Sequence, residues 1–376
     1  MANRGMTPTI LHVIDTTGPG GAETVFLALA EGCIKQGYRS VALIRGPGWV
    51  EQQLKQRSIP YYVRDCKGSL NFRFLREMFA IIRKENVTHI QSHLLGSNVY
   101  TSIAGLFARL PVTATFHGHV DISPDERFRN AKLALIKMGA RHVVSVTEDL
   151  KNTINHTTGS YCQLHPMVIP NGIDLSELEK LPVQPLEKTD RPLVFGCLGN
   201  IRPAKNYSLA VEFVQLLKDK GVNVKLRIAG DDTKSGAIEL KKVVSELGLE
   251  DNVEFLGFID NVPDFLGSID IFLMTSSSEG HPLALTQALA AAKPILTTPN
   301  GVERLVPRHL LFLAEEHNAA ALFVALEKVE QALEDKSPGN IEGLHRLREG
   351  REYVKDNYSE KVMRERYMNL YGIEAV

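Results

Sequence analysis

The stretch TILHVIDTTGPGGAETVFLALAEGCIKQGYRSVALIRG (residues 9–46) decides the fold class. It begins with a run of β-branched and leucine side chains, typical of a buried strand, and leads into a glycine-containing loop. Apolar residues between Val25 and Ala30 then share one face of a helix that ends near Gly37, and SVALIRG (40–46) is the next strand. Two strands joined by a helix of this length form a parallel βαβ unit.

The same alternation of strands and helices continues along the rest of the chain. The first half has further strands predicted at 87–93, 112–118 and 142–147, and helices at 73–84, at 126–139 and through Leu106. The second half restarts the pattern, with strands at 192–200, 224–230, 252–258, 268–274 and 294–298, helices at 207–220 and 283–292, one that ends at Gly248, and two C-terminal helices. The order predicts an α/β protein with two Rossmann-like, doubly wound domains facing across a cleft.

A proline-rich connection separates the two halves. Pro166–Asp174 and Leu181–Pro192 carry turn-forming residues, which places an N-terminal domain at 1–180 and a C-terminal domain at 190–355. The last segment, YSEKVMRERYMNLY, has its apolar residues at helical spacing, and an amphipathic helix needs a surface on which to dock. We expect residues 358–376 to return to the first domain.

Composition narrows the class of protein further. The 376 residues are 44% hydrophobic and 23% charged, which is typical of soluble globular domains and excludes general disorder, a collagen-like fibre and a polytopic membrane protein. A net charge of −1 argues against a nucleic-acid binder. The four cysteines lack CxxC spacing, and no segment has the length and apolarity of a signal peptide or a membrane span. These features predict a reduced, cytoplasmic protein.

Three segments carry chemistry, and the first is GPGGAE (18–23), directly after the first strand. Gly20 and Gly21 allow close backbone approach, and free N–H groups at a helix start attract anions or sugar hydroxyls. An ordinary glycine-rich turn is the alternative. The segment is not G-x-G-x-x-G, and the next strand ends at Arg45 instead of an acidic ribose ligand, which argues against a dinucleotide site.

The second segment is GNIRPAKN (199–206), after the first strand of the C-terminal domain. Arg202 and Lys205 stand where strand meets helix, at the position where doubly wound sheets bind phosphates. A guanidinium, an ammonium and a helix N-terminus together neutralise a diphosphate. A solvated basic loop is the alternative.

The third segment is SSSEGHPLALTQALAAAKP (276–294). Glu279 follows a strand, so its carboxylate is placed to accept hydrogen bonds from sugar hydroxyls, and Gln287 follows eight positions later on the next helix. A surface glutamate is the alternative.

The order of these segments resembles a known family along essentially the whole chain. The shared segments are GPGGAE (18–23), TFHGH (115–119), IPNGID (169–174), LGNIRPAKN (198–206), LRIAGDD (226–232), VEFLGFIDNVPDFLGSIDIFLMTSSSEGHPLALTQALAAAKPIL (253–296) and NGVERL (300–305). They are similar to those of the GT-B-fold glycosyltransferases of the large retaining group designated family 4.

The resemblance implies roles for individual residues. Lys205 matches the lysine that contacts the donor diphosphate, Glu279 the first Glu of an E-x7-E motif that holds the donor sugar, and His117 a histidine near the reacting sugar. It implies catalytic roles for His117 and Glu279, and donor-binding roles for Gly20, Gly21, Asn200, Arg202, Lys205, Gly257, Phe258, Ile259, Gly280, His281, Pro282, Leu283 and Gln287.

Two positions depart from the family pattern. The second Glu of E-x7-E is Gln287, which keeps hydrogen-bonding capacity without the strength of a charged acceptor. The position after the glycine of the second segment, usually Arg, is Asn200, and Arg202 is expected to supply the missing positive charge.

The resemblance implies transfer of a hexose from a UDP- or GDP-sugar to a glycan or lipid-linked acceptor in cell-surface polysaccharide synthesis, with retention of anomeric configuration. No cofactor is expected, and no metal either, because Asp231 and Asp232 lack D-x-D spacing and are read as turn residues. A catalytically weak nucleotide-sugar or glycan-binding protein and an epimerase of the same fold are the alternatives.

Charge is unevenly divided along the chain. Residues 1–176 hold 19 Lys and Arg against 13 Asp and Glu, while the remainder holds 24 against 31. The basic helices at 72–84 and 126–141 could lie on anionic lipid headgroups at the inner face of the membrane, with solvated helix faces as the alternative.

Overall fold

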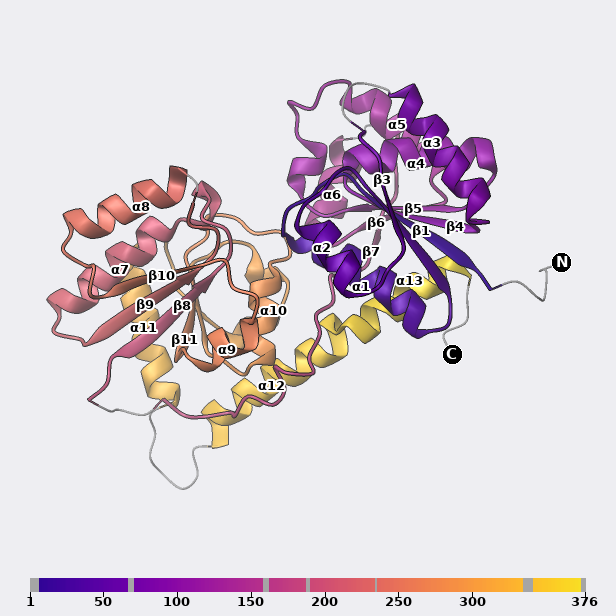
Figure 1. The fold of residues 1–376 in the computed structure, drawn as a ribbon. Helices are drawn as coiled ribbons and strands as arrows, with labels where there is room; N and C mark the ends of the chain where they lie inside the picture. Colours follow the sequence, from indigo (N-terminus) through magenta and orange to yellow (C-terminus); the bar gives the residue numbers. More distant parts are fainter. Residues whose placement is uncertain are drawn as a thin grey trace. The chain divides into compact units, whose positions relative to one another are not determined.

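The computed structural model describes residues 7–66, 71–157, 162–186, 190–233, 235–333 and 341–372. The chain forms two compact units (Figure 1). The first comprises Met1–Gly172 and Glu360–Val376, and the second comprises Ile173–Ser359.

The first unit is built around a parallel sheet with the strand order β3-β2-β1-β4-β5-β6-β7. Its elements are β1 (Thr9–Ile14), α1 (Gly21–Lys35), β2 (Arg39–Ile44), α2 (Trp49–Gln56), β3 (Tyr61–Val63), α3 (Phe72–Lys84), β4 (His89–His93), α4 (Leu95–Ala108), β5 (Val112–Phe116), α5 (Arg129–Gly139), β6 (His142–Ser145), α6 (Glu148–Thr157), β7 (Met167–Val168) and α13 (Glu360–Tyr371).

The C-terminal helix α13 completes the core of the first unit, as the sequence predicts. Tyr367 and Met368 are buried against side chains of β1 and α1, including Ile10 and Leu29. Where the chain leaves this unit, the backbone N–H of Gly172 lies 3.1 Å from the sulfur of Met363. The apolar face of the last helix is therefore part of the first unit's interior.

The second unit repeats the architecture with the strand order β10-β9-β8-β11-β12-β13. Its elements are β8 (Leu193–Leu198), α7 (Tyr207–Asp219), β9 (Val224–Ala229), α8 (Ser235–Glu246), β10 (Val253–Gly257), α9 (Val262–Gly267), β11 (Ile271–Met274), α10 (Leu283–Ala290), β12 (Ile295–Thr297), β13 (Leu311–Leu313), α11 (Ala319–Leu333) and α12 (Ile341–Tyr358).

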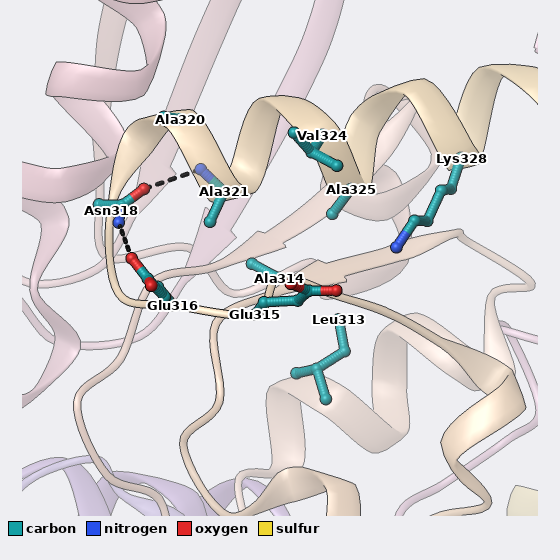
Figure 2. Close-up of a pocket in the computed structure, with 10 residues that line it drawn as sticks. All are labelled: Leu313, Ala314, Glu315, Glu316, Asn318, Ala320, Ala321, Val324, Ala325 and Lys328. Carbon is teal, nitrogen blue, oxygen red and sulfur yellow. Dashed lines mark hydrogen bonds between the residues drawn. The ribbon is translucent and has the colours of Figure 1, made fainter.

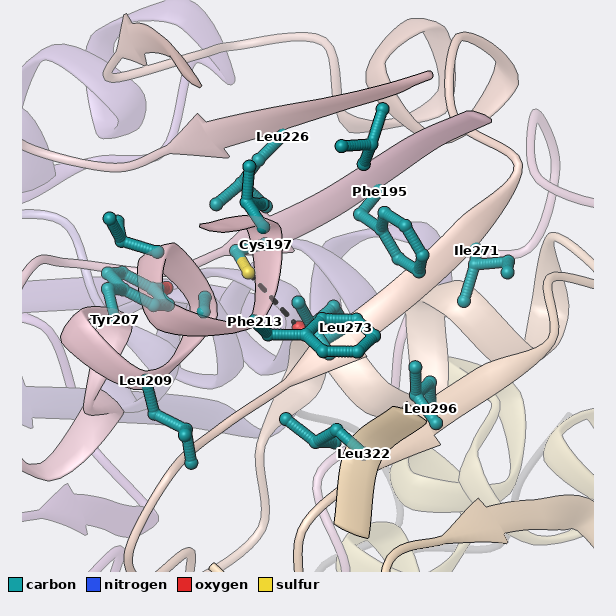
Figure 3. Close-up of a cluster of buried hydrophobic side chains, with 14 of the residues drawn as sticks. Phe195, Cys197, Tyr207, Leu209, Phe213, Leu226, Ile271, Leu273, Leu296 and Leu322 are labelled. Carbon is teal, nitrogen blue, oxygen red and sulfur yellow. Dashed lines mark hydrogen bonds between the residues drawn. The ribbon is translucent and has the colours of Figure 1, made fainter. Parts of the chain in front are cut away.

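Aromatic and aliphatic side chains fill the space between this second sheet and its helices (Figure 3). Phe195 and Phe213 meet edge to face, with ring centroids 5.5 Å apart. The thiol of Cys197 donates to the backbone carbonyl of Leu273 across neighbouring strands, at 3.3 Å. All four cysteines of the chain are free thiols. The predicted α/β fold with two Rossmann-like units is confirmed.

Both sheets reverse their strand order beside a central strand. β1 pairs with β2 on one side and β4 on the other, and β8 pairs with β9 and β11. In doubly wound sheets ligands bind outside the carboxyl ends of the strands at such a reversal. The fold therefore directs attention to the loops that follow β1, β4, β8 and β11.

Some predicted elements are wrong in detail. Pro166–Asp174 is not simply a connection, since β7 pairs there with β6 as an edge strand. Among the residues that the structure describes, three C-terminal helices follow β12, not two, and β13 precedes them. The helix predicted at 126–139 begins at Arg129. The short strands β3, β7 and β13 have only two or three residues each, too few to show a period.

Candidate functional site

The loops after β8, β9 and β10 of the second unit are packed against one another. The backbone N–H of Gly230 donates to the carbonyl of Gly257 at 2.8 Å, and that of Gly199 donates to Ala229 at 2.8 Å. A Cβ atom at Gly230 would lie 2.1 Å from the Gly199 carbonyl oxygen, so only glycine allows this approach. Predicted donor-binding residues of separate segments thus lie on adjoining loops.

Lys205 is held at the carboxyl end of this sheet by its backbone. It ends a 3-10 turn that starts at Pro203, and Asn206 then adopts a left-handed conformation with φ of 47° before α7 begins. The hydroxyl of Thr275, directly after β11, donates to the Lys205 carbonyl at 3.1 Å. The lysine is therefore anchored to both strands that flank the reversal in strand order.

The side chains of Lys205 and Glu279 form an ion pair. Nζ of the lysine lies 2.7 Å from Oε1 of the glutamate, and the Ser276 hydroxyl donates to the same oxygen at 2.6 Å. The side chains are 21% and 11% exposed. The backbone of Glu279 is fixed by a 2.9 Å bond from its N–H to the carbonyl of Asn300, in the loop after β12. Glu279 is thus not a solvated surface glutamate.

Gly199 makes room for the lysine. A Cβ at this position would lie 3.0 Å from Cε of Lys205, and the glycine has a φ of 139°. The hydroxyl of Tyr207 donates to the Gly199 carbonyl at 3.0 Å. Burial raises the pKa of Tyr207 well above its ordinary value, so the hydroxyl remains a donor.

The other predicted residues of the second unit lie in or beside the loops after β8, β10 and β11, or on α10. Arg202 and Phe258 are exposed, while Asn200, Gly257, Ile259, Gly280, Leu283 and Gln287 are partly buried. Gly257 needs its left-handed φ of 66°, where a Cβ would lie 3.4 Å from Asp232. Pro282 caps the N-terminus of α10, on which Gln287 lies.

His281 is packed inward. Its ring lies 4.9 Å from that of Tyr358, and both ring nitrogens are buried without hydrogen-bond partners among the described residues. Burial lowers its pKa to about 4, so the imidazole is neutral. A direct hydrogen bond from this ring to a donor stays a prediction.

The two aspartates after β9 form turn and surface contacts, as the sequence predicts. Asp231 accepts from the backbone N–H and hydroxyl of Thr233, at 3.1 and 2.6 Å, and Asp232 pairs with Lys241 at 2.6 Å. Within the described ranges no group of three or more His, Cys, Asp or Glu side chains could hold a metal ion.

A cavity of about 260 Å³ lies elsewhere in the second unit, between β13 and α11 (Figure 2). The side chain of Asn318 accepts from the backbone N–H of Ala321 at 2.8 Å and donates to Glu316 at 2.7 Å. These contacts cap the start of α11. None of the predicted site residues lines this cavity.

In the first unit, Gly20 and Gly21 begin α1. A Cβ at Gly20 would lie 2.4 Å from Oε2 of Glu23, because the buried carboxylate folds back over the helix start. Asp15 lies one residue after β1, and burial raises its pKa to about 6. A Cβ at Gly96 would lie 2.0 Å from its carboxylate, so α4 begins directly against Asp15.

His117 lies at the carboxyl end of β5, next to a second histidine. Its Nε2 is 2.8 Å from Nδ1 of His93, which ends β4. Its backbone N–H donates to the carboxylate of Asp121 at 2.8 Å. Burial lowers the pKa of His117 to about 3 and raises that of Asp121 to about 6. His119 is exposed and lies 3.1 Å from Asp149.

The sequence motifs do not predict three residues of this region as site residues: Asp15, His93 and Asp121. The signal for two of them was present in the sequence. TILHVID and VTHIQSH each end in a polar, titratable residue at the strand's carboxyl end, where the Rossmann architecture places ligands. Asp121 has no such signal, because it reaches His117 through a 3-10 turn.

None of the helices in the described ranges combines the length and the apolarity needed to cross a bilayer.

Comparison with known proteins identifies both units. Residues 180–350 match the family model described as glycosyl transferases group 1, and residues 19–177 match the model described as Glycosyltransferase Family 4. The chain is 22% identical over 297 residues to the capsular polysaccharide biosynthesis glycosyltransferase CapH of Staphylococcus aureus, covering 74% of this chain and 78% of that one.

Two further proteins extend the comparison. The chain is 22% identical over 300 residues to the Escherichia coli UDP-Gal:alpha-D-GlcNAc-diphosphoundecaprenol alpha-1,3-galactosyltransferase, covering 75% of this chain and 76% of the relative. The structure of Anabaena Alr3699/HepE in complex with UDP and glucose superimposes with a TM-score of 0.77 at 20% identity, covering 97% and 99% of the two chains. With both units matched, this chain is a glycosyltransferase of the GT-B fold, group 1.

Proposed function

We propose that this protein transfers a hexose from a nucleotide diphosphate sugar to a glycan or lipid-linked acceptor in cell-surface polysaccharide synthesis. The observation that carries the proposal is the pair of Lys205 and Glu279 at the carboxyl ends of β8 and β11. Relatives support it as well. HepE binds UDP and glucose, and the E. coli relative is named for UDP-Gal as donor and a diphosphoundecaprenol-linked sugar as acceptor.

The pair suits the two halves of such a donor. An ammonium group has three N–H donors and a carboxylate about four acceptor sites, so each retains capacity beyond the 2.7 Å contact. Phosphate oxygens only accept from an ammonium, and sugar hydroxyls donate well to a carboxylate. Since the phosphate and the sugar are adjacent in a nucleotide diphosphate sugar, one ligand can engage both side chains.

Charge on the leaving group sets the chemical requirement. As the bond between the anomeric carbon and the phosphate oxygen breaks, negative charge grows on the diphosphate. Lys205 and the exposed Arg202 stabilise this charge, and we propose that they do so without a divalent metal. The neutral ring of His117 donates a hydrogen bond to the transferred sugar.

We further propose retention of anomeric configuration by a front-face route. The acceptor oxygen bonds to the anomeric carbon on the side from which the diphosphate leaves, and the acceptor proton passes to a phosphate oxygen. A covalent route would need a carboxylate nucleophile beside a second carboxyl. Glu279 is instead engaged by Lys205 and Ser276.

The alternative of a catalytically weak binding protein is not favoured, because the relatives are named as glycosyltransferases. The two departures from the family pattern, Asn200 and Gln287, are still expected to lower the affinity for the donor. An amide at Gln287 is a weaker acceptor for ribose hydroxyls than a carboxylate.

An anionic membrane is the proposed surface for a lipid-linked acceptor. Helices α3, α4 and α5 of the first unit lie side by side, with Phe74 on Tyr100 at 5.0 Å and Gly139 against the Ser102 carbonyl. This helix layer, α3, α4 and α5 with the residues that directly flank them, carries exposed apolar and basic side chains: Phe72, Arg76, Arg83, Phe107, Arg109, Arg127, Phe128, Lys137 and Met138. Amphipathic surfaces of this composition bind anionic headgroups.

The site proposal is tested by measuring release of nucleoside diphosphate from UDP-Glc, UDP-Gal, UDP-GlcNAc and GDP-Man. Lys205→Ala removes a charged contact to the leaving group and should lower kcat by about 100-fold or more. Glu279→Gln keeps the shape and should lower kcat/KM by roughly 10–100-fold. EDTA should leave the rate unchanged.

A matched control is Lys55→Ala, which breaks an ion pair to Glu51 in the first unit and should leave turnover at the wild-type value. Full activity in both site variants would contradict the assignment.

A further inference from the structure

A run of buried polar side chains crosses the first unit from its strand ends to its C-terminal helix. His117 Nε2 lies 2.8 Å from His93 Nδ1, and His93 Nε2 lies 3.4 Å from the amide nitrogen of Gln91. Gln91 accepts from the Tyr371 hydroxyl at 2.9 Å and donates to the Thr115 hydroxyl at 3.0 Å. His93, Gln91 and Thr115 are wholly buried, so these groups must satisfy one another.

The orientation of the Gln91 amide determines which of these groups donate hydrogen bonds and which accept them. Its nitrogen lies 3.4 Å from the backbone carbonyl of Ser92, which can only accept a hydrogen bond. Its oxygen lies 2.9 Å from the Tyr371 hydroxyl. The reversed amide would set two acceptors against each other at Ser92. The NH2 group therefore faces His93 Nε2 at 3.4 Å, and its two hydrogens are shared among Thr115, Ser92 and this ring nitrogen. A ring N–H at Nε2 would set two donors against each other, so Nε2 of His93 is the acceptor.

The tautomer of His93 in turn determines the tautomer of His117. Burial lowers the pKa of both histidines, so each neutral ring carries one proton. With Nε2 of His93 accepting, its proton is on Nδ1 and is donated to Nε2 of His117. The proton of His117 is then on Nδ1.

The run ends on a donor without an acceptor. Nδ1 of His117 is buried and has no hydrogen-bond partner among the described residues. A buried N–H left unpaired costs roughly 1–3 kcal/mol, which an incoming acceptor would recover. What distinguishes this donor from the unpaired ring nitrogens of His12 is its position directly after the carboxyl end of β5, where ligands bind in doubly wound sheets.

We propose that Gln91 and His93 are positioning residues that fix the tautomer of His117, so that Nδ1–H is offered to a hydroxyl oxygen of the transferred sugar. We call this series of contacts, from Tyr371 through Gln91 and His93 to His117, the relay. Tyr371 of α13 orients the Gln91 amide, at which the relay starts. The proposal rests on the proposed function for its ligand, while the tautomer itself is a property of the protein alone. Neither Gln91 nor His93 touches the sugar.

The test is a two-bond ¹H–¹⁵N NMR spectrum of the full chain with ¹⁵N-labelled histidine, in which Nδ1–H and Nε2–H tautomers give different patterns. His117 is assigned by its loss in His117→Gln. The wild-type protein should show His117 as Nδ1–H. Gln91→Glu keeps the acceptor for Tyr371 but presents an acceptor to His93, so both histidines should change to Nε2–H, and kcat should fall by about tenfold.

His93→Asn is the rescue variant, because its amide nitrogen replaces Nδ1 as a donor. It should retain the Nδ1–H pattern of His117 and most of kcat, whereas the apolar His93→Leu should lose both. Nε2–H at His117 in the wild type, or an unchanged tautomer in Gln91→Glu, would overturn the relay. A correct set of tautomers in a protein that transfers no sugar would instead refute the proposed function and leave the relay standing.

Discussion

His12 lies in the middle of β1 with no contact that would favour a charge. Its side chain is wholly buried, both ring nitrogens lack hydrogen-bond partners among the described residues, and its ring meets that of Phe26 at 6.3 Å. Burial lowers its pKa from 6.5 to about 3. The unfolded chain therefore binds a proton below pH 6.5 that the folded chain refuses, and stability falls as the pH drops through that window.

We predict that His12→Met removes this dependence. At pH 5 the lost linkage is worth on the order of 2 kcal/mol per buried histidine, so the variant should lose less stability than the wild type between pH 7 and pH 5. Urea unfolding at the two values measures the difference. Asp15 and Asp121, whose raised pKa values act in the opposite direction, are common to both proteins and cancel.

The control is Ile238→Ser, at an exposed position without a titratable side chain, which should leave the pH dependence of the wild type in place. Equal slopes for His12→Met and the wild type would show that His12 can be protonated in the folded state.

At the scale of single residues, sequence motifs predict the charged residues of the site better than they predict the buried residues that hold site side chains in place. Lys205 and Glu279 are predictable because each follows a strand in a recognisable segment, and the structure places them 2.7 Å apart. Gln91 and Tyr371 are not, because they are 280 positions apart in sequence and meet only when α13 docks on the sheet. Such a contact leaves no local pattern.

At the scale of elements, the long helices and central strands are predictable and the edge strands are not. β1 is buried along its whole length and reads as an apolar run. β7 has two residues, with Met167 46% exposed, so neither length nor burial marks it. The segment is a strand because its backbone pairs with β6, and its own sequence does not predict that pairing.

The helix layer of α3, α4 and α5 makes a testable surface. Phe72 and Phe107 are 73% and 74% exposed, an unusual position for aromatic rings unless they meet an apolar partner. We predict binding to phosphatidylglycerol–phosphatidylcholine vesicles that weakens at high salt. Replacing Phe72, Phe107 and Phe128 by Ser should weaken co-sedimentation by at least tenfold, since each ring contributes about 1.5–3 kcal/mol when fully buried.

Ile238→Ser is the matched control for that surface. Ile238 is 63% exposed on α8 of the second unit, so its replacement should leave vesicle binding unchanged. Binding that does not depend on anionic lipid, or that persists in the triple variant, would show that this helix layer is simply solvated.

At the scale of the whole molecule, the chain enters the first unit twice. It leaves after Gly172 and returns at Glu360, so the first unit is made of two segments that are far apart in the sequence. α13 buries Met363, Tyr367 and Met368 in that unit. At about 1.5–3 kcal/mol for each fully buried side chain, the helix supplies a stabilisation comparable to that of an entire domain.

We predict that a chain ending at Ser359 unfolds in its first unit alone. The second unit keeps Lys205, Glu279 and every strand of its sheet, so a thermal shift induced by UDP should survive, while protease sites within β1 and α1 become accessible. A chain ending at Gly372, which retains α13, is the control and should melt as the full-length protein does. If the chain ending at Ser359 kept both its first unit and its His117 tautomer, the buried face of α13 would be dispensable, and the relay that starts at Tyr371 would need another origin.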